Sequence, residues 1–343
     1  MSTGRRVEGL HLVAALAVVL LLASFGVGCS SGSREKVVVY SGRSTELIKP
    51  VLDLFAKETG ISVEFKQADT ADLALTIEQE GDRSPADVFI SQTPGATSYL
   101  ASKGLLRTLP NSILERVEPE NRSANGEWVG LSARIRVLVY NTELVDPATL
   151  PRSVFDLTDP QYRGKLGVAP TNGSFQDFVS AMRVEHGDDV TRSWLEGIEA
   201  NQPRTYANNN AIVDAVGRGE VPMGLANHYY LLRAKKEDPG IPAENYFFPD
   251  RDVGSVRIVS AAAVLKSAKN PSAAERLVQF LLSEQTQRYF ADETLEYPLV
   301  QGVEPAPGVP PIGSIPVNRV DFDELGARFN ETVALIKESG LTR

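Results

Sequence analysis

The sequence is poor in the residues that build disulfides, thiol chemistry and histidine metal sites. It has one cysteine, Cys29, and three histidines among 343 residues. Because Cys29 lies next to an N-terminal apolar stretch, the domain that follows has neither a disulfide nor a thiol ligand. The two histidines of that domain, His186 and His228, are far apart in sequence. A His-rich zinc or copper site is therefore disfavoured.

Motifs of catalysis and nucleic-acid binding are also missing. The sequence contains no phosphate loop of the Gly-Lys-Ser type and no His-Glu-x-x-His, so we expect a protein that is not an enzyme. The formal net charge is -9, which disfavours nucleic acid and an anionic membrane surface as partners. We expect contact with a membrane only through a lipid anchor.

The start of the chain resembles an export signal. Arg5 and Arg6 precede an uncharged apolar stretch, 12–24, which is shorter than the roughly 20 residues that span a bilayer. We interpret residues 1–28 as a signal peptide. Cys29 follows Gly28 as at a lipoprotein cleavage site, although Gly26 stands where leucine is usual. We expect Cys29 to be acylated, with residues 29–36 as a lipidated tether on the outer face of the cytoplasmic membrane.

Apolar periodicity predicts an α/β fold. In the first third, strands expected at 37–40, 61–65 and 86–90 alternate with helices at 47–57, 71–80 and 96–102. This order predicts a mostly parallel sheet with helices on both faces. The theme repeats after residue 133, and 256–265 is expected to return to the first sheet. We predict two lobes, 37–133 plus about 256–310 and about 134–255 plus about 311–343, with a ligand cleft between them.

Three tyrosines suggest a hard metal ion. Tyr229 and Tyr230 are adjacent, and Tyr140 ends the apolar run 137–140. A phenol has a pKa of about 10 and stays protonated at neutral pH unless a strongly polarising cation binds it. Three phenolates would suit a trivalent ion such as Fe³⁺. The alternative is that these tyrosines simply pack in the core, as most tyrosines do.

Several stretches together resemble the ferric-ion-binding proteins of bacterial ABC importers. They are Val38-Val-Tyr-Ser-Gly-Arg43, Pro85-Ala-Asp-Val-Phe89, Lys103-Gly-Leu-Leu106, Arg134-Ile-Arg-Val-Leu-Val-Tyr-Asn141, Gly219-Glu-Val-Pro222, Asn227-His-Tyr-Tyr230 and Glu296-Tyr-Pro-Leu-Val300. The resemblance covers most of residues 36–320. It implies a two-lobe periplasmic binding protein fold, type II-like, with mixed, mostly parallel sheets. It also implies a monomer that delivers iron to an ABC permease and its ATPase.

The resemblance implies roles for individual residues. Tyr229, Tyr230 and Tyr140 are the implied metal ligands, and His228 is implied to orient the tyrosine loop. Relatives often add a histidine or tyrosine after the first strand and a glutamate after the third, where this chain has Ser44, Thr45 and Gln92. A synergistic anion, carbonate or phosphate, would complete the shell. Candidates for holding it are Asn172, Gly173, Ser174, Asn209, Asn227, Gln92 and Arg43, although Arg43 would equally suit an ion pair.

Two other readings of the sequence remain open. The same fold could bind a phosphorylated or cationic organic solute, such as a sugar phosphate, a phosphonate, thiamine or a polyamine, and the missing first-lobe ligands favour this alternative. A surface hydrolase or an adhesion module is the other alternative. A hydrolase would need a nucleophile beside a histidine, and we identify none.

Overall fold

The computed structural model describes Met1 and residues 35–342. The predicted signal peptide beyond Met1 and the lipidation site at Cys29 lie outside the described residues. In the part that the model describes, no helix is both long enough and apolar enough to cross a membrane.

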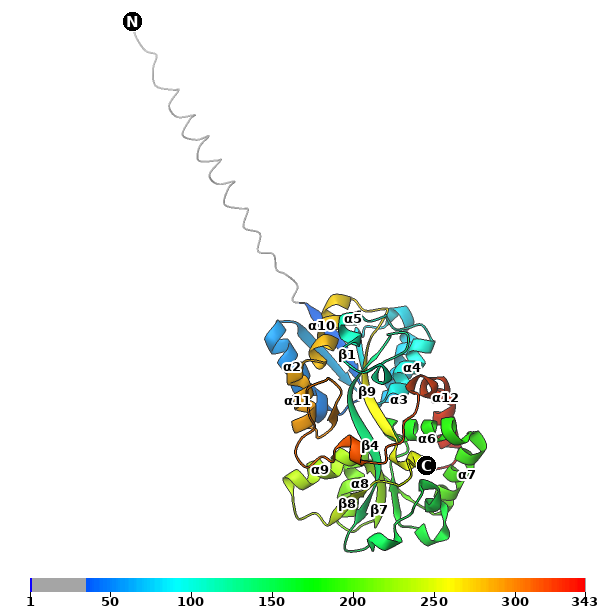
Figure 1. Cartoon of the computed structure of the whole chain (residues 1–343). Helices are drawn as coiled ribbons and strands as arrows, with labels where there is room; N and C mark the ends of the chain where they lie inside the picture. Colours follow the sequence, from blue (N-terminus) through cyan, green and yellow to red (C-terminus); the bar gives the residue numbers. More distant parts are fainter. Residues whose placement is uncertain (2–34, 343) are drawn as a thin grey trace. The chain divides into compact units, whose positions relative to one another are not determined.

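Ten strands form one mixed sheet in the order β2-β1-β3-β9-β4-β7-β5-β6, with β10 and β8 paired to β4 (Figure 1). The strands are β1 (Lys36–Ser41), β2 (Ser62–Gln67), β3 (Val88–Ser91), β4 (Val129–Asn141), β5 (Leu166–Val168), β6 (Arg204–Thr205), β7 (Met223–Asn227), β8 (Ala243–Tyr246), β9 (Arg257–Val264) and β10 (Tyr297–Pro298). The helices are α2 (Thr45–Thr59), α3 (Thr70–Glu80), α4 (Pro94–Ser102), α5 (Asn111–Leu114), α6 (Gly173–His186), α7 (Asp188–Ala200), α8 (Asn209–Gly217), α9 (His228–Glu237), α10 (Pro271–Leu281), α11 (Glu284–Asp292) and α12 (Phe322–Glu338).

The first part of the fold has the predicted β-α-β-α-β order. β1 pairs in parallel with both β2 and β3, and its β-branched residues 37–39 are buried on both faces. α2 ends at Gly60, whose φ of 74° is the left-handed conformation that glycine adopts at helix ends. The turn after β1 is tight, because a Cβ on Gly42 would lie 1.9 Å from Thr70 Oγ1. This close approach fixes the backbone position from which the side chain of Arg43 extends.

β4 joins the two parts of the sheet. All 13 of its residues are buried, as expected for a strand covered on both faces. It pairs with β9 as far as Ile135 and with β7 from Arg136 onward. One continuous strand is thus shared by both parts of the sheet. We refer to the sheet on the β9 side, with its helices, as the first half and to the β7 side as the second half.

The second half repeats the α/β theme. β5 pairs in parallel with β6 and β7, and β8 adds an antiparallel strand to β4. α6 to α9 surround these strands. The carboxyl end of β7 lies beside the middle of β4, since Asn227 pairs with Arg136. Loops that leave β7 therefore face the junction between the halves.

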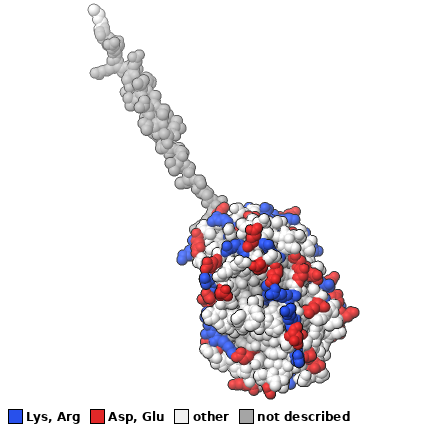
Figure 2. Space-filling view, viewed as in Figure 1, with Lys and Arg blue, Asp and Glu red and all other residues white. Residues whose placement is uncertain are grey.

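α12 packs against both α4 and α6 (Figure 1). The contacts include Tyr99 against Phe329 on the α4 side and Arg183 to Thr332 on the α6 side. The surface view shows acidic and basic side chains interspersed around an uncharged central area (Figure 2). No continuous basic patch lies on that face.

Candidate metal centre

The two adjacent tyrosines lie in the first turn of α9. β7 ends at Asn227, which has extended backbone angles, and the helix begins at the next residue. The rings of Tyr229 and Tyr230 are stacked, with centroids 4.1 Å apart and planes 28° from parallel. Both residues are buried, with 2% and 5% of their surfaces exposed. At the helix start, the two neighbouring side chains thus lie side by side. In the middle of a helix, adjacent side chains point about 100° apart.

The hydroxyls of the tyrosine pair are unbonded but not fully buried, since neither is among the buried polar atoms that lack a partner. No described residue hydrogen-bonds to the hydroxyl of Tyr229 or Tyr230, whereas Tyr99, Tyr206 and Tyr297 each have a partner. Burial, and next the neighbouring Tyr230, raises the pKa of Tyr229 well above its usual value. The apo site therefore holds a neutral phenol, and only a strong cation would stabilise its phenolate.

His228 anchors the start of α9 to β4. Its Nδ1 accepts the backbone N–H of Ile135 at 3.2 Å, and its ring packs 5.0 Å from that of Tyr297. Burial lowers the pKa of His228 to about 4, so the ring is neutral. The contacts hold the residue next to the tyrosine pair rather than presenting Nδ1 to a ligand. The orienting role of His228 stays a prediction.

Asparagine and serine side chains beside the tyrosines form one hydrogen-bonded network. Asn227 and Asn209 each accept a bond from Arg136 Nη1, at 3.2 and 3.3 Å. Their amide groups donate to Ser174 Oγ at 3.2 and 3.4 Å. Asn172 caps α6 by accepting the N–H and the hydroxyl of Ser174. The network brings the amino end of α6, an intrinsic anion site, to the end of β7.

The two halves touch at this place. A Cβ built on Gly173 in the second half would lie 3.4 Å from Gln92 Oε1 and from Thr70 Cβ in the first. Nearby, Asp177 Oδ2 accepts the N–H of Gly95 at 2.9 Å, across the same junction. The structure is therefore a closed form, and the closure explains the burial of the tyrosines.

Three buried arginines lie at the centre, and two of them pair with one carboxylate. Arg43, Arg134, Arg136 and Glu296 are each at most 1% exposed. Glu296 pairs with Arg43 at 2.5 Å and with Arg134 at 3.6 Å. Burial alone would raise the pKa of Glu296, but Arg43 and Arg134 hold it below its usual value. Arg136 has no carboxylate partner among the described residues, and burial lowers its pKa to about 9.

Several of the guanidinium nitrogens are free to bind. Arg43 Nε, and both Nε and Nη2 of Arg134 and Arg136, are buried without a hydrogen-bond partner among the described residues. An unpaired buried donor costs about 1–3 kcal/mol. The arrangement thus offers donors and positive charge to an anion.

The structure does not bring Tyr140 to the tyrosine pair. Tyr140 pairs with Met223, while Arg136 pairs with Asn227 at the other end of β7. Four residues of strand span about 13 Å. Tyr140 is next to Glu244 instead, and burial raises its pKa. Because Tyr140 and the pair belong to the same half, movement of one half against the other would not join them.

Most of the other predicted site residues do converge. The structure gathers Tyr229, Tyr230, His228, Asn227, Asn209, Asn172, Gly173, Ser174, Gln92 and Arg43 around the junction. Sequence reasoning missed Arg134, Arg136 and Glu296 as site residues. Two arginines at alternate positions of an otherwise apolar strand share one face, and that pattern could have indicated them. No group of three or more His, Cys, Asp or Glu residues suited to a metal occurs within the described part of the chain.

The fold and this buried, anion-ready junction define a solute-binding protein of the two-part α/β type. The family model for bacterial extracellular solute-binding proteins matches residues 83–326. The chain belongs to this family.

Individual relatives agree with that assignment. An Fe(3+)-binding periplasmic protein of Serratia marcescens is 31% identical over 339 residues, which cover 98% of this chain and 99% of the relative. The structure of iron-bound HitA from Pseudomonas aeruginosa has a TM-score of 0.85 and 36% identity, covering 89% of this chain and 99% of that one. A Trichodesmium protein in complex with iron and citrate has a TM-score of 0.73 and 28% identity, over 89% and 99%.

These findings confirm the predicted α/β binding-protein fold and the resemblance to ferric-ion-binding proteins. They also confirm the prediction of an extracytoplasmic binding protein of an importer rather than an enzyme.

Proposed function

We propose that this chain binds ferric iron through the phenolates of Tyr229 and Tyr230 together with a synergistic anion. It then delivers the ion to an ABC permease and its ATPase. The observation that supports this most is the stacked, buried tyrosine pair without a hydrogen bond to either hydroxyl. The rings are buried, but neither hydroxyl is among the buried polar atoms that lack a partner, so both hydroxyls remain accessible to a ligand that they would complete.

The charge balance favours an anion beside the metal. A ferric ion and three guanidinium groups carry six positive charges, against three negative charges from two phenolates and Glu296. Burying such an excess is unfavourable without a counter-ion. Carbonate, phosphate or a carboxylate such as citrate would satisfy the unpaired donors of Arg134 and Arg136. Asn172, Gly173, Ser174, Asn209, Asn227 and Gln92 would surround the same anion. The Trichodesmium relative was solved with iron and citrate.

Loading would proceed from an open form. The second half would capture the ion on its tyrosines, and the first half would close over it with Arg43 and Gln92. The lobes would be 37–133 plus about 256–310 and about 134–255 plus about 311–343, turning about β4 and β9. The closed form, as a monomer, would dock on the permease. Acylated Cys29 would hold the protein at the outer face of the membrane.

Ferric titration tests the metal centre. Purified protein with ferric iron and carbonate should develop a visible phenolate-to-iron absorption band. Tyr229→Phe with Tyr230→Phe should abolish the band and weaken iron binding more than about 100-fold, since outer partners alone are worth about 10–100-fold. Tyr140→Phe is the matched control and should keep the band. A band that survives the double substitution, or its absence in the parent protein, would refute the assignment.

The arginine cluster also favours one alternative ligand. Unpaired guanidinium donors next to the amino end of α6 would suit the phosphate of an organic solute without any metal. Calorimetry on iron-free protein with a sugar phosphate and a phosphonate separates the two functions. Tight binding of either, without a tyrosine band on iron addition, would favour the organic solute.

A further inference from the structure

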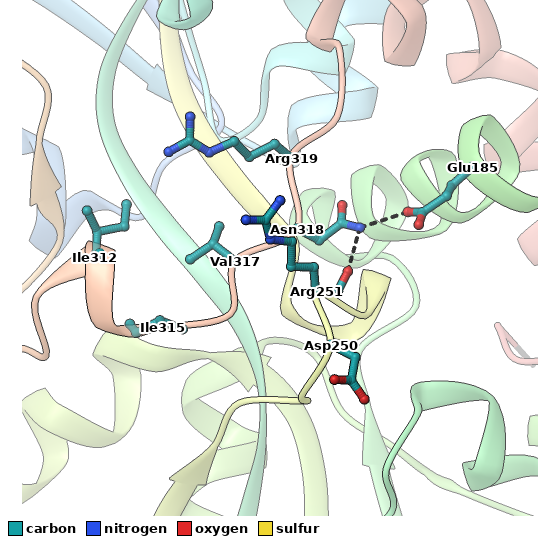
Figure 3. A pocket seen from close by; sticks show the side chains of 9 residues that line it. Glu185, Asp250, Arg251, Ile312, Ile315, Val317, Asn318 and Arg319 are labelled. Carbon is teal, nitrogen blue, oxygen red and sulfur yellow. Dashed lines mark hydrogen bonds between the residues drawn. The ribbon is translucent and has the colours of Figure 1, made fainter.

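A second pocket lies away from the metal centre, where the chain crosses from β10 to α12. Its volume is about 610 Å³ (Figure 3). The walls come from three separate segments: Glu185 near the end of α6, the turn Asp250–Arg251 before β9, and the crossover 312–319. None of these residues belongs to the metal centre.

Asn318 forms a fixed part of the pocket wall. Its backbone N–H donates to Ser255 O, and its own carbonyl accepts the N–H of Arg257. Its Nδ2 donates to Glu185 Oε2 at 2.8 Å and to Arg251 O at 2.9 Å. Its Oδ1 is buried and has no partner among the described residues. One rigidly held, unused acceptor thus lies within the pocket wall.

The turn before β9 is held in an unfavourable conformation. Asp250 and Arg251 both have φ of 58°, in the left-handed region that residues other than glycine rarely occupy, and least often in succession. Asp250 ion-pairs with Arg152 at 3.3 Å. The guanidinium of Arg251 makes no hydrogen bond or ion pair with a described residue. Backbone strain that places a free side chain in a pocket is typical of ligand-binding positions.

A second guanidinium and an apolar wall complete the pocket. Arg319 lines it and ion-pairs only with Glu120, at 3.1 Å and at the surface. In Figure 3 the side chains of Arg251 and Arg319 both extend toward Val317. Ile312 and Ile315 line the same crossover. Positive groups therefore stand at the edge of a small apolar surface.

We propose that this pocket binds a small carboxylate that also carries a hydrogen-bond donor, such as a hydroxy- or amino-dicarboxylate. Arg251 and Arg319 each offer a planar fork that fits a carboxylate. Asn318 Oδ1 accepts the hydroxyl or ammonium donor, and the isoleucines cover the carbon skeleton. The volume falls within the range of about 300–1,000 Å³ that small ligands occupy. Glu185 and Asp250 disfavour a polyanion.

Three nearly isosteric acids test this assignment: succinate, malate and aspartate. Calorimetry is done on the parent protein after ferric loading, so that the central anion site is filled. Malate or aspartate should bind with about one equivalent and at least tenfold more tightly than succinate, which lacks the donor. Malate binding more tightly than aspartate identifies the hydroxy acid as the ligand class, and the reverse identifies the amino acid. Equal affinity for all three would overturn the role of Asn318, and no binding would overturn the site.

Two glycine substitutions separate ligand binding from backbone strain. Arg251→Gly relieves the left-handed residue and removes the guanidinium, so the melting temperature should stay or rise while binding falls at least tenfold. Asp250→Gly relieves the same kind of strain and leaves Arg251, so binding should persist. Repeated on iron-free protein, the difference between the two variants does not depend on iron binding, because neither residue belongs to the metal centre, so failure of the metal centre would not affect it. Unchanged binding in Arg251→Gly would overturn the proposal.

Discussion

The two halves of the molecule contribute opposite chemistry to one site. The second half supplies oxygens and amides: the stacked tyrosines, the asparagine–serine network and the amino end of α6. The first half supplies Arg43, Glu296 and Gln92, and it has Ser44, Thr45 and Gln92 where the family resemblance implies a histidine or tyrosine and a glutamate. Arg134 and Arg136 lie on β4 at the border between the halves, where the pairing of β4 changes from β9 to β7. The comparison suggests that one half selects the cation, while the other balances charge and closes over an anion.

The largest expected effect comes from removing the only carboxylate of the central cluster. Glu296→Gln leaves three buried guanidinium groups without a counter-charge, and breaking a buried pair in this way costs about 3–5 kcal/mol. Urea unfolding of the iron-free protein measures the change. Glu293→Gln is the control, because its pair with Lys236 is at the surface and should contribute nothing measurable. Equal stability of both variants would contradict a structural role for the cluster.

The pH dependence of iron binding tests how many phenolates the second half provides. Each phenol that binds as phenolate releases one proton, and burial raises the pKa of Tyr229 further above neutrality. Acid therefore weakens binding, by up to about a hundredfold per pH unit for two phenolates and about tenfold for one. Competition with a chelator of known proton affinity, between pH 6 and 8, gives the slope. Tyr229→Phe should halve the slope of the logarithm of iron affinity against pH. An unchanged slope would exclude Tyr229 as a ligand.

Closure by the first half can be weakened at a single contact. A Cβ on Gly95 would lie 2.5 Å from Asp177 Oδ1, across the junction. Gly95→Ala should favour the open form and lower iron affinity about tenfold, equivalent to about 1.4 kcal/mol. Gly313→Ala is the control, because its added methyl meets no atom within 4 Å. Small-angle scattering should show a larger radius for loaded Gly95→Ala, and identical curves would contradict the closure role.

Local patterns predicted more of this molecule than distant pairings did. The order of strands and helices in the first half follows from apolar periodicity, and the position of Tyr229 and Tyr230 at a helix start follows from the small, apolar strand before them. Tyr140 ends an apolar run, and the family resemblance implies it as a third ligand of the same site. The register of β4 against β7 instead separates Tyr140 from the tyrosine pair. A strand register depends on contacts that no local sequence pattern specifies.

The arginine cluster illustrates the same limit. Arg134 and Arg136 alternate within a buried strand, which could have indicated a functional face. Glu296, however, comes from a segment far along the chain, and only the pairing of β10 with β4 brings it there. Similarly, Arg251 carries no sequence signal for left-handed backbone, whereas Asp250 is of a residue type that is enriched there.

The comparison between the halves can be sharpened by giving the first half the carboxylate that the family resemblance implies at position 92. Gln92→Glu places a carboxylate opposite Gly173, at the junction with the tyrosine half. The new charge would offset one arginine and could reach the metal in place of the anion. We expect iron affinity to rise about fivefold, or about 1 kcal/mol, and its dependence on added carbonate to fall. Gln161→Glu, at an exposed position of the second half, is the control and should change neither. If Gln92→Glu instead keeps the full anion dependence, the first half serves the anion alone, and the division of roles is stricter than proposed.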